Sequence, residues 1–417
     1  MNRPVNHPVN RPLDTAVTAV TAAPAAPAAP AGLAVQAGPS GPPPVLLLFP
    51  GQGSQHARMA VGLYGHDAAF TDAMDAAFAA FDASGASGAC GAYGVSGAKC
   101  PAVGEALRAD WLTDRPAVPL DHVTRSQPLL FAVGHALGRM LLEHGVRPWA
   151  LLGHSVGELA AATLAGVFSL EAAAGLLLDR VDRLASAPPG GMLAVAATAE
   201  ALRPFVTDEV VVAAVNAPRQ TILAGPRDPL AAVARALRDA GLTCRPVPSL
   251  TAFHSPSLGA ATAGSFDRFA ATPVAAPRIP LHSGYRAEPL TAQLAADPSY
   301  WASHPVEPVR FWPALDALLG GGRDGTVCVE AGPGQGLSTI ARQHPTVRAG
   351  RGTVVPLLPP RPGPPEADRD AVAAALTALR DRGAVPDREA LRGHSAPPGG
   401  AAVPGPGERL APQRGSA

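Results

Sequence analysis

The chain contains 417 residues, of which 47% are hydrophobic and 16% are charged, so it can bury a sizeable core in one large domain or in two. Its formal net charge is +0, which argues against binding of nucleic acid or a membrane surface by bulk electrostatic attraction. The four cysteines have no metal-ligand spacing, and no apolar run is long enough to span a bilayer. We therefore expect a reduced, cytoplasmic protein that binds no metal.

Both ends of the chain differ in composition from its middle. Residues 1–44 are dominated by Ala, Pro, Val and Thr, and residues 394–417 are rich in Pro and Gly. Neither segment can bury a core, so both are predicted to be disordered. Between them we expect a large subdomain formed by residues 45–188 and 251–393, with a small subdomain of residues 189–250 inserted into it.

The first predicted strand, Val45–Phe49, runs into a glycine-rich loop with the sequence PGQGSQ. Such a loop can present backbone N–H groups to an oxygen anion. It lacks the lysine of a phosphate-binding loop and the third glycine of a dinucleotide fingerprint, which argues against nucleotide binding. Apolar spacing then predicts a helix within residues 61–82, a surface loop over 83–104 and a helix over 127–144.

Residues 149–166 read WALLGHSVGELAAATLAG, an apolar run that ends in GHSVG and passes into an alanine-rich helical pattern. This is the strand-turn-helix context of a G-x-S-x-G nucleophile elbow. The glycines on either side of Ser155 permit a tight, strained turn that holds its hydroxyl above the sheet, next to the positive end of the helix. The pattern predicts a serine nucleophile for acyl transfer, and the alternative is an ordinary turn with a solvated serine.

A separate small unit follows. Its apolar runs predict strand, helix, strand, strand, helix and strand over residues 192–197, 199–206, 209–215, 220–224, 229–240 and 243–247. This β-α-β-β-α-β order is typical of a ferredoxin-like subdomain. The chain then returns to the large subdomain, where the predicted elements are a strand at 279–282, a helical region at 298–319, a strand at Thr326–Glu330 and a helix at 368–382.

A nucleophilic serine needs a base, and His254 lies in a loop after the last strand of the small subdomain, where a rigid scaffold can aim it. Spacing alone does not select it, and the other candidates are His122, His282, His304 and His344. No acidic residue between the serine and His254 stands at an obvious strand end, so a dyad oriented by a backbone carbonyl is as plausible as a triad. The predicted oxyanion donors are the backbone N–H groups of Gln52 and Val156.

Four motifs follow one another along the chain: FPGQGSQ at 49–55, GHSVGE at 153–158, AFH at 252–254 and EAGPG at 330–334. In this order and combination, residues 45–391 closely resemble the malonyl-CoA:acyl carrier protein transacylases and the acyltransferase domains of modular polyketide synthases. The resemblance implies an α/β fold. Its large subdomain is expected to be α/β-hydrolase-like, with a parallel sheet and the nucleophile elbow, and its inserted small subdomain to be ferredoxin-like.

The resemblance also implies roles for individual residues. Ser155 is the acylated nucleophile, His254 is its base, and Gln52 and Val156 are the oxyanion donors. Arg180 stands where the family places the arginine that pairs with the free carboxylate of malonyl-type substrates, a task that suits a planar guanidinium. Considered alone, an arginine between two aspartates of an amphipathic helix is most often a solvated surface charge.

Three more positions match the family near the acyl group and the thioester arm, namely Gln127, Asn216 and Phe253. A bulky Phe253 before the histidine resembles the malonyl-type pattern, because its volume narrows the pocket. The chain departs from the family at Thr251, where histidine is commoner. Residues 281–284 replace an Asn-containing segment that helps to orient the base through its backbone.

Together these residues predict a discrete, trans-acting, monomeric enzyme without a metal or redox cofactor. It would move malonyl from malonyl-CoA through Ser155 to the phosphopantetheine thiol of an acyl carrier protein, by a ping-pong mechanism, in fatty acid or, by preference, polyketide biosynthesis. The alternatives are hydrolysis of acyl-carrier thioesters by the same residues, carrier-to-carrier transfer of a bulkier chain, and a non-catalytic docking module. Neither nucleic acid nor a membrane is an expected partner.

Overall fold

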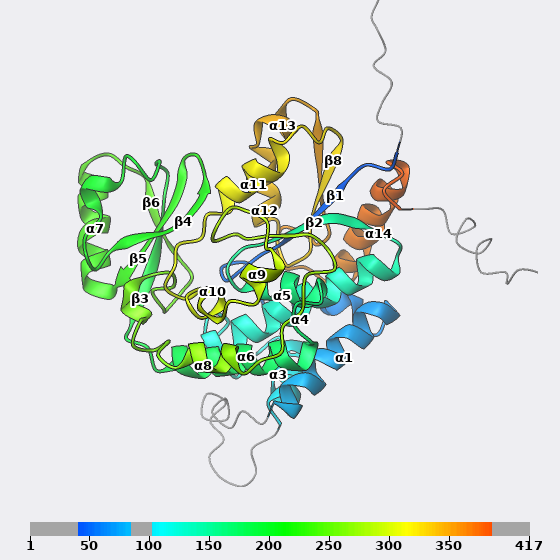
Figure 1. Ribbon diagram of the computed structural model, residues 1–417, viewed down its shortest axis with the longest axis horizontal. Coiled ribbons are helices and arrows are strands. Elements are labelled where there is room, and N and C mark those ends of the chain that lie inside the picture. Colours follow the sequence, from blue (N-terminus) through cyan, green and yellow to red (C-terminus); the bar gives the residue numbers. More distant parts are fainter. Residues whose placement is uncertain (1–40, 85–101, 386–417) are drawn as a thin grey trace, which may run out of the picture. The chain divides into compact units, whose positions relative to one another are not determined.

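The computed structural model describes residues 41–84 and 102–385, which Figure 1 shows as coloured ribbons. Residues 1–40 of the predicted leader, the whole predicted tail and most of the loop predicted at 83–104 lie outside the described residues. Within the described ranges, no helix combines the length and the apolarity that crossing a bilayer requires.

The large subdomain is built on a five-stranded parallel sheet with the strand order β7-β2-β1-β8-β9. Figure 1 labels its three inner strands, β2, β1 and β8. Its strands are β1 (Val45–Phe49), β2 (Pro148–Gly153), β7 (Leu281–His282), β8 (Thr326–Glu330) and β9 (Gly352–Pro356). The central strand β1 is buried along its whole length, as expected of a strand that is covered on both faces. Because the strands are parallel, the loops after β1, β2 and β8 meet at one edge of the sheet.

Helices pack against this sheet and against one another. In chain order they are α1 (Ala68–Ala83), α3 (Val103–Leu112), α4 (Val123–Glu143), α5 (Val156–Leu164), α6 (Leu170–Ala185), α8 (Ser265–Ala270), α9 (Ala292–Ala295), α10 (Pro298–Ala302), α11 (Phe311–Leu319), α12 (Gly336–Arg342), α13 (Pro345–Arg348) and α14 (Pro365–Asp381), and the 3-10 turns are η1 (Val61–Leu63), η2 (Arg203–Phe205) and η3 (Pro256–Leu258). α5 packs on β1 and β2, whereas α12, α13 and α14 pack on β9. α4 is almost entirely buried because α1, α3, α5 and α6 surround it.

A second sheet comes from the segment between residues 190 and 247. Its strands are β3 (Gly190–Val195), β4 (Val211–Ala217), β5 (Gln220–Pro226) and β6 (Cys244–Val247), in the order β4-β5-β3-β6 with every neighbouring pair antiparallel. α7 (Arg227–Asp239) covers one face (Figure 1). Alternate side chains of β3 pack into two different hydrophobic cores. Leu193 and Val195 pack with α7, whereas Met192 and Ala194 pack against the core of the large subdomain. This arrangement is ferredoxin-like, and the boundaries at residues 189 and 250 stay a prediction.

Two predicted helices differ from the structure. The prediction of a helix at 199–206 is wrong, because only the 3-10 turn η2 forms there. Pro204 has no N–H to donate and disfavours helical backbone before it, which prevents a full α-helix. The single helix predicted within 61–82 divides into η1 and α1, since Gly65 has a positive φ of 73° and Asp67 caps the N-terminus of α1.

The helical region predicted at 298–319 is also interrupted. An irregular segment, residues 303–310, separates α10 from α11 and contains two prolines. Val309 in this segment donates its N–H to the carbonyl oxygen of Ala213 at 2.9 Å and accepts from the N–H of Val215 at 2.9 Å. The segment is therefore hydrogen-bonded to β4, so the second sheet is tied to the chain that precedes α11.

The turn from β2 to α5 leaves no room for a side chain at Gly153 or Gly157, which lie two residues before and after the serine. A Cβ atom on Gly153 would overlap the backbone of Glu158, and one on Gly157 would overlap the carbonyl oxygen of Phe49 in β1. Ser155 itself has a φ of 56° and a ψ of −123°, which L-residues rarely adopt. The close packing of α5 on β1 therefore depends on both glycines.

We expect Gly157→Ala to lower the free energy of unfolding by at least about 2 kcal/mol, because the added methyl group must displace backbone atoms of β1. Gly336→Ala is the matched control, since a Cβ atom there meets nothing within 4 Å and the residue begins α12. Urea unfolding of the two variants measures the difference. Equal stability of the two would contradict the close approach of α5 to β1.

Candidate functional site

Ser155 lies at the N-terminus of α5, at the edge of the sheet where the loops after β1 and β2 meet. These strands are parallel neighbours, which brings Gly51 against the serine: a Cβ atom on Gly51 would lie 3.0 Å from that of Ser155. The backbone N–H groups of Gln52 and Val156 donate to no acceptor among the described residues. Both groups are therefore available to bind an oxyanion formed next to the serine.

His254 faces Ser155, with its Nε2 atom 2.8 Å from the serine Oγ. On the other side of the ring, Nδ1 lies 2.9 Å from the carbonyl oxygen of His304 and 3.0 Å from that of Glu307. These two acceptors place the ring proton on Nδ1, which leaves the Nε2 lone pair for the serine proton. No carboxylate of the described chain bonds to the ring, so the arrangement is a dyad oriented by backbone. The orienting carbonyls do not come from residues 281–284, where the resemblance placed them.

The protonation state of His254 suits a general base. Burial lowers the pKa of His254 to about 4, with smaller contributions from His154 and Arg180. The ring is therefore neutral at neutral pH, the state in which it can accept a proton. Of the other candidate bases, His304 lines the same cavity but offers His254 only its carbonyl, and in the described structure no hydrogen bond joins the serine to His122, His282 or His344.

Arg180, on α6, is buried and lines the same cavity as Ser155 and His254. Its guanidinium donates to the carbonyl oxygen of Trp301 at 3.2 Å. Burial lowers the pKa of Arg180, and no carboxylate within the described ranges lies at ion-pair distance from it. A buried cation is stabilised by an anionic partner, so this side chain can hold a ligand carboxylate. It is not the solvated surface charge that the helix pattern alone indicates.

The remaining predicted site residues divide between this cavity and its surroundings. Phe253 and Gln127 line the cavity, and the Phe253 ring centroid is 6.4 Å from that of His254. Gln127 donates to Oε1 of Gln52 at 3.5 Å. Asn216 does not line the cavity but bonds to the histidine that precedes the serine, since its Oδ1 accepts from that ring at 2.8 Å. The fold thus gathers residues that lie far apart in the sequence.

A groove of about 640 Å³ runs beside the cavity, between the loops after β1 and β8 and one face of the second sheet. Its lining includes Gln52, His154 and Asn216, together with Arg245 from β6. Because His154 directly precedes the serine, the groove reaches the neighbourhood of Ser155. Its volume and its mixture of apolar and polar groups suit an extended ligand.

Behind the serine turn lies a buried carboxylate, Glu158, the last residue of the GHSVGE motif, for which no role was predicted. Glu158 accepts from Gly284 N at 2.8 Å and bonds to the hydroxyl of Tyr300, which also bonds to Ser283 Oγ at 2.6 Å. Burial raises the pKa of Glu158 to about 7, although these hydrogen bonds and Arg180 oppose the rise. A lone glutamate at the start of an otherwise apolar helix was the available sequence signal.

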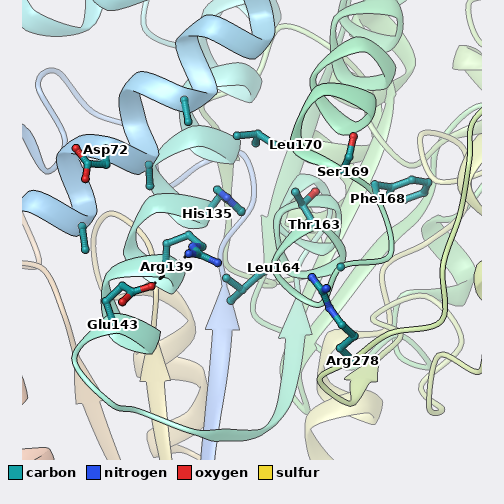
Figure 2. Close-up of a pocket in the computed structure, with 14 residues that line it drawn as sticks. Asp72, His135, Arg139, Glu143, Thr163, Leu164, Phe168, Ser169, Leu170 and Arg278 are labelled. Carbon is teal, nitrogen blue, oxygen red and sulfur yellow. Dashed lines mark hydrogen bonds and ion pairs between the residues drawn. The ribbon is translucent and has the colours of Figure 1, made fainter. Parts of the chain in front are cut away.

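A larger hollow of about 760 Å³ lies among α1, α4, α5 and the segment that enters α6 (Figure 2). Figure 2 shows His135 within its lining and Arg139 beside Glu143, to which the arginine donates at 3.3 Å. Burial lowers the pKa of His135 to about 4. None of the residues predicted for acyl transfer lines this hollow. The arrangement of side chains, and not the size of a cavity, therefore identifies the candidate site.

The comparisons with known sequences agree on one family. Residues 46–359 match the family model described as the acyl transferase domain. A phenolphthiocerol/phthiocerol polyketide synthase subunit, from Mycobacterium tuberculosis, is 34% identical over 72% of this chain and 19% of its own length. Polyketide synthase GfsB of Streptomyces halstedii is 36% identical over 64% of this chain and 5% of its own length. The chain thus spans about a fifth or less of these relatives.

Solved structures of acyltransferases share the fold. The acyl transferase domain of SpnD, in complex with 2-(pent-4-yn-1-yl)malonyl, has a TM-score of 0.72 and 29% identity over 84% of this chain and 79% of its own. The acyltransferase domain from the second module of the salinomycin polyketide synthase has a TM-score of 0.69 and 32% identity, over 85% and 79%. FabD from Acinetobacter baumannii, at 21% identity and a TM-score of 0.66 over 82% and 99%, shares the fold. The predicted α/β fold class is confirmed.

We expect Glu158→Gln to gain stability relative to the wild type as the pH rises from about 5 to about 8. The folded pKa of about 7 exceeds the ordinary value of 4.5, so the native state keeps a proton that the unfolded state releases, and wild-type stability falls as the pH rises through this window. The amide can replace the neutral carboxyl but cannot ionise, so the difference should approach about 3 kcal/mol. Urea unfolding across this range measures it. A difference that does not change with pH would contradict the raised pKa.

Proposed function

Because the chain belongs to the acyl transferase domain family, we propose that it transfers a malonyl-type acyl group from coenzyme A to the phosphopantetheine thiol of an acyl carrier protein. The observation that supports this most directly is the 2.8 Å contact between Ser155 Oγ and His254 Nε2, in a cavity that Arg180 also lines. A nucleophile, its base and a cation for the free carboxylate are then within reach of one short acyl group.

In the first half-reaction, Ser155 Oγ attacks the thioester carbonyl carbon and His254 Nε2 takes the hydroxyl proton. The backbone N–H groups of Gln52 and Val156 hold the negative oxygen of the tetrahedral intermediate. The C–S bond then breaks, and the imidazolium returns its proton to the sulfur of coenzyme A. The two backbone carbonyls at Nδ1 stabilise the imidazolium while it holds the proton.

In the second half-reaction, the carrier's thiol reaches the malonyl-serine ester along the groove that Asn216 and Arg245 line. His254 takes the thiol proton, the sulfur attacks the ester carbonyl, and Ser155 Oγ leaves and regains a proton from His254. The products are malonyl-carrier protein and free enzyme. A groove of about 640 Å³ with polar lining groups suits this step, because the phosphopantetheine arm is long and carries polar amide groups.

The identity of the acyl group and the pathway belong to the same proposal. Phe253 lines the acyl cavity beside the base, and its volume favours malonyl over α-branched groups. The polyketide synthase relatives support a place in polyketide biosynthesis. A discrete, trans-acting, monomeric and cytoplasmic protein stays a prediction from the sequence.

Intact-mass measurement after incubation with malonyl-CoA tests the proposal. We expect the wild type to gain one malonyl group, Ser155→Ala to gain none, and His254→Ala to gain it at least about 100-fold more slowly, because it lacks the base. Holo carrier protein added afterwards should collect the group. Free malonate instead of malonyl-carrier protein would favour hydrolysis, and a wild type without an adduct would refute acyl transfer from malonyl-CoA. Methylmalonyl, ethylmalonyl and acetyl thioesters in parallel would define the acyl preference.

The pH dependence of acylation should follow the pKa of His254, which burial lowers to about 4. We expect kcat/KM for acylation to stay constant from about pH 8 down to about pH 5.5 and to fall only near pH 4, as the base becomes protonated. An unshifted histidine would lose activity already near about pH 6.5. Rapid-quench acylation gives the profile, and circular dichroism at each pH checks that the protein is folded. A midpoint near that of an ordinary histidine would contradict the buried, neutral base.

A further inference from the structure

Tyr285 lies shortly after β7, and only 6% of its surface is exposed. Its hydroxyl is buried and makes no hydrogen bond of ordinary geometry among the described residues, although it lies close enough to the Ser155 hydroxyl for that group to affect its pKa. An unpaired buried hydroxyl costs about 1–3 kcal/mol, and such groups are uncommon in native proteins. No sequence motif marks this residue, so its environment must indicate what the hydroxyl does.

The side chain of Tyr285 lines the same cavity as Ser155, Arg180 and His254. Burial raises the pKa of Tyr285 and the charge of Glu158 adds to the rise, whereas Arg180 and the Ser155 hydroxyl oppose it, so the phenol end lies near Ser155 and Arg180 as well as Glu158. The cavity has a volume of only about 10 Å³. This is about the space of one water molecule, so an acyl group can enter only if lining side chains shift, and Tyr285 is one of the side chains that it meets.

Stacking holds the Tyr285 ring in position. Its centroid is 3.8 Å from that of His304, and the two ring planes are 14° apart. The carbonyl oxygen of the same His304 accepts from His254 Nδ1. One residue thus positions both the base and the tyrosine. Because the stack involves the ring and not the hydroxyl, a phenylalanine can occupy the same place.

Tyr285 and Arg180 supply hydrogen-bond donors to the cavity. Burial keeps the phenol protonated at neutral pH, so its O–H is available. Arg180 has one hydrogen bond in the described structure, to the carbonyl oxygen of Trp301, and its guanidinium carries further N–H groups. The ligand group that complements two such donors is a carboxylate, which can accept one hydrogen bond on each oxygen.

We propose that Tyr285 is a specificity-determining residue whose hydroxyl donates a hydrogen bond to the free carboxylate of the acyl group, beside Arg180. This inference rests on the proposed function, in which Ser155 carries a malonyl-type group. An acyl group without a carboxylate leaves both donors unpaired. The pair therefore selects dicarboxylic over monocarboxylic thioesters, in addition to any selection by size.

Replacement of the hydroxyl tests this contact. We expect Tyr285→Phe to lower kcat/KM for acylation by malonyl-CoA about 10- to 100-fold, as for loss of a hydrogen bond to a charged group. Acylation by acetyl-CoA should be unchanged, because acetyl offers no carboxylate. Quenched-flow mixing followed by intact-mass measurement gives both rates. The unfolding midpoint should equal or exceed that of the wild type, since the change removes a buried hydroxyl that makes no hydrogen bond of ordinary geometry within the described protein.

Tyr300→Phe is the matched control. Its hydroxyl bonds to Glu158 and Ser283, and the residue does not line the cavity. We expect this variant to lose stability while its malonyl-to-acetyl rate ratio stays at the wild-type value.

A Tyr285→Phe protein with an unchanged rate ratio, or with both rates lowered equally, overturns the carboxylate contact. A wild type that forms no Ser155 adduct with either thioester overturns the proposed function itself, which is a distinguishable result. In an Arg180→Ala background, we expect Tyr285→Phe to have a smaller effect on acylation by malonyl-CoA, because the carboxylate is no longer held in place. The decrease in the logarithm of the rate should be less than half of the decrease that Tyr285→Phe causes in the wild type. Full additivity of the two changes would count against a shared carboxylate.

Discussion

The close approach of α5 to β1 at the serine turn is the constraint on which the rest of the structure depends. Gly153 and Gly157 permit it, because any Cβ atom at either position would overlap backbone atoms. The turn gives Ser155 its positive φ and projects its side chain from the edge of the sheet. The same packing brings the loop after β1 against the serine. The same close approach of α5 to β1 therefore produces both the core packing and the candidate oxyanion site.

Burial around this turn shifts each ionisable group toward its neutral form. It lowers the pKa of His254 and of Arg180 and raises that of Glu158 to about 7. Glu158 is therefore about half ionised near pH 7 and makes no ion pair with Arg180, so it compensates the charge on Arg180 only in part. The positive charge of Arg180 therefore favours an anionic ligand in the cavity. This electrostatic bias supports the proposed malonyl-type substrate independently of any sequence resemblance.

Local patterns predicted the elements whose residues carry a strong signal of their own. The VLLLF run, the strand at Thr326–Glu330 and the strands of the second sheet all lie at or within a few residues of their predicted positions. Weak or conflicting signals produced the errors. Pro204 interrupts an otherwise helical spacing at 199–206. Neither α3, which begins directly after a Gly-rich stretch, nor β9, which runs into prolines, was predicted. In each case a residue that disfavours regular structure lies in the element or next to it.

The sequence by itself predicted the serine turn and the order of elements in the small subdomain, because apolar periodicity and flanking glycines are properties of neighbouring residues, and the resemblance carried by four motifs in order implied the α/β fold class. It also assembled the list of candidate site residues, whose chemical roles remain proposals. Only the tertiary structure decided that His254 is the histidine facing Ser155, and that its ring is held by carbonyls of His304 and Glu307. It alone revealed the buried Glu158 and the unpaired hydroxyl of Tyr285. These features depend on contacts between residues far apart in the chain, and such contacts leave no local pattern in the sequence.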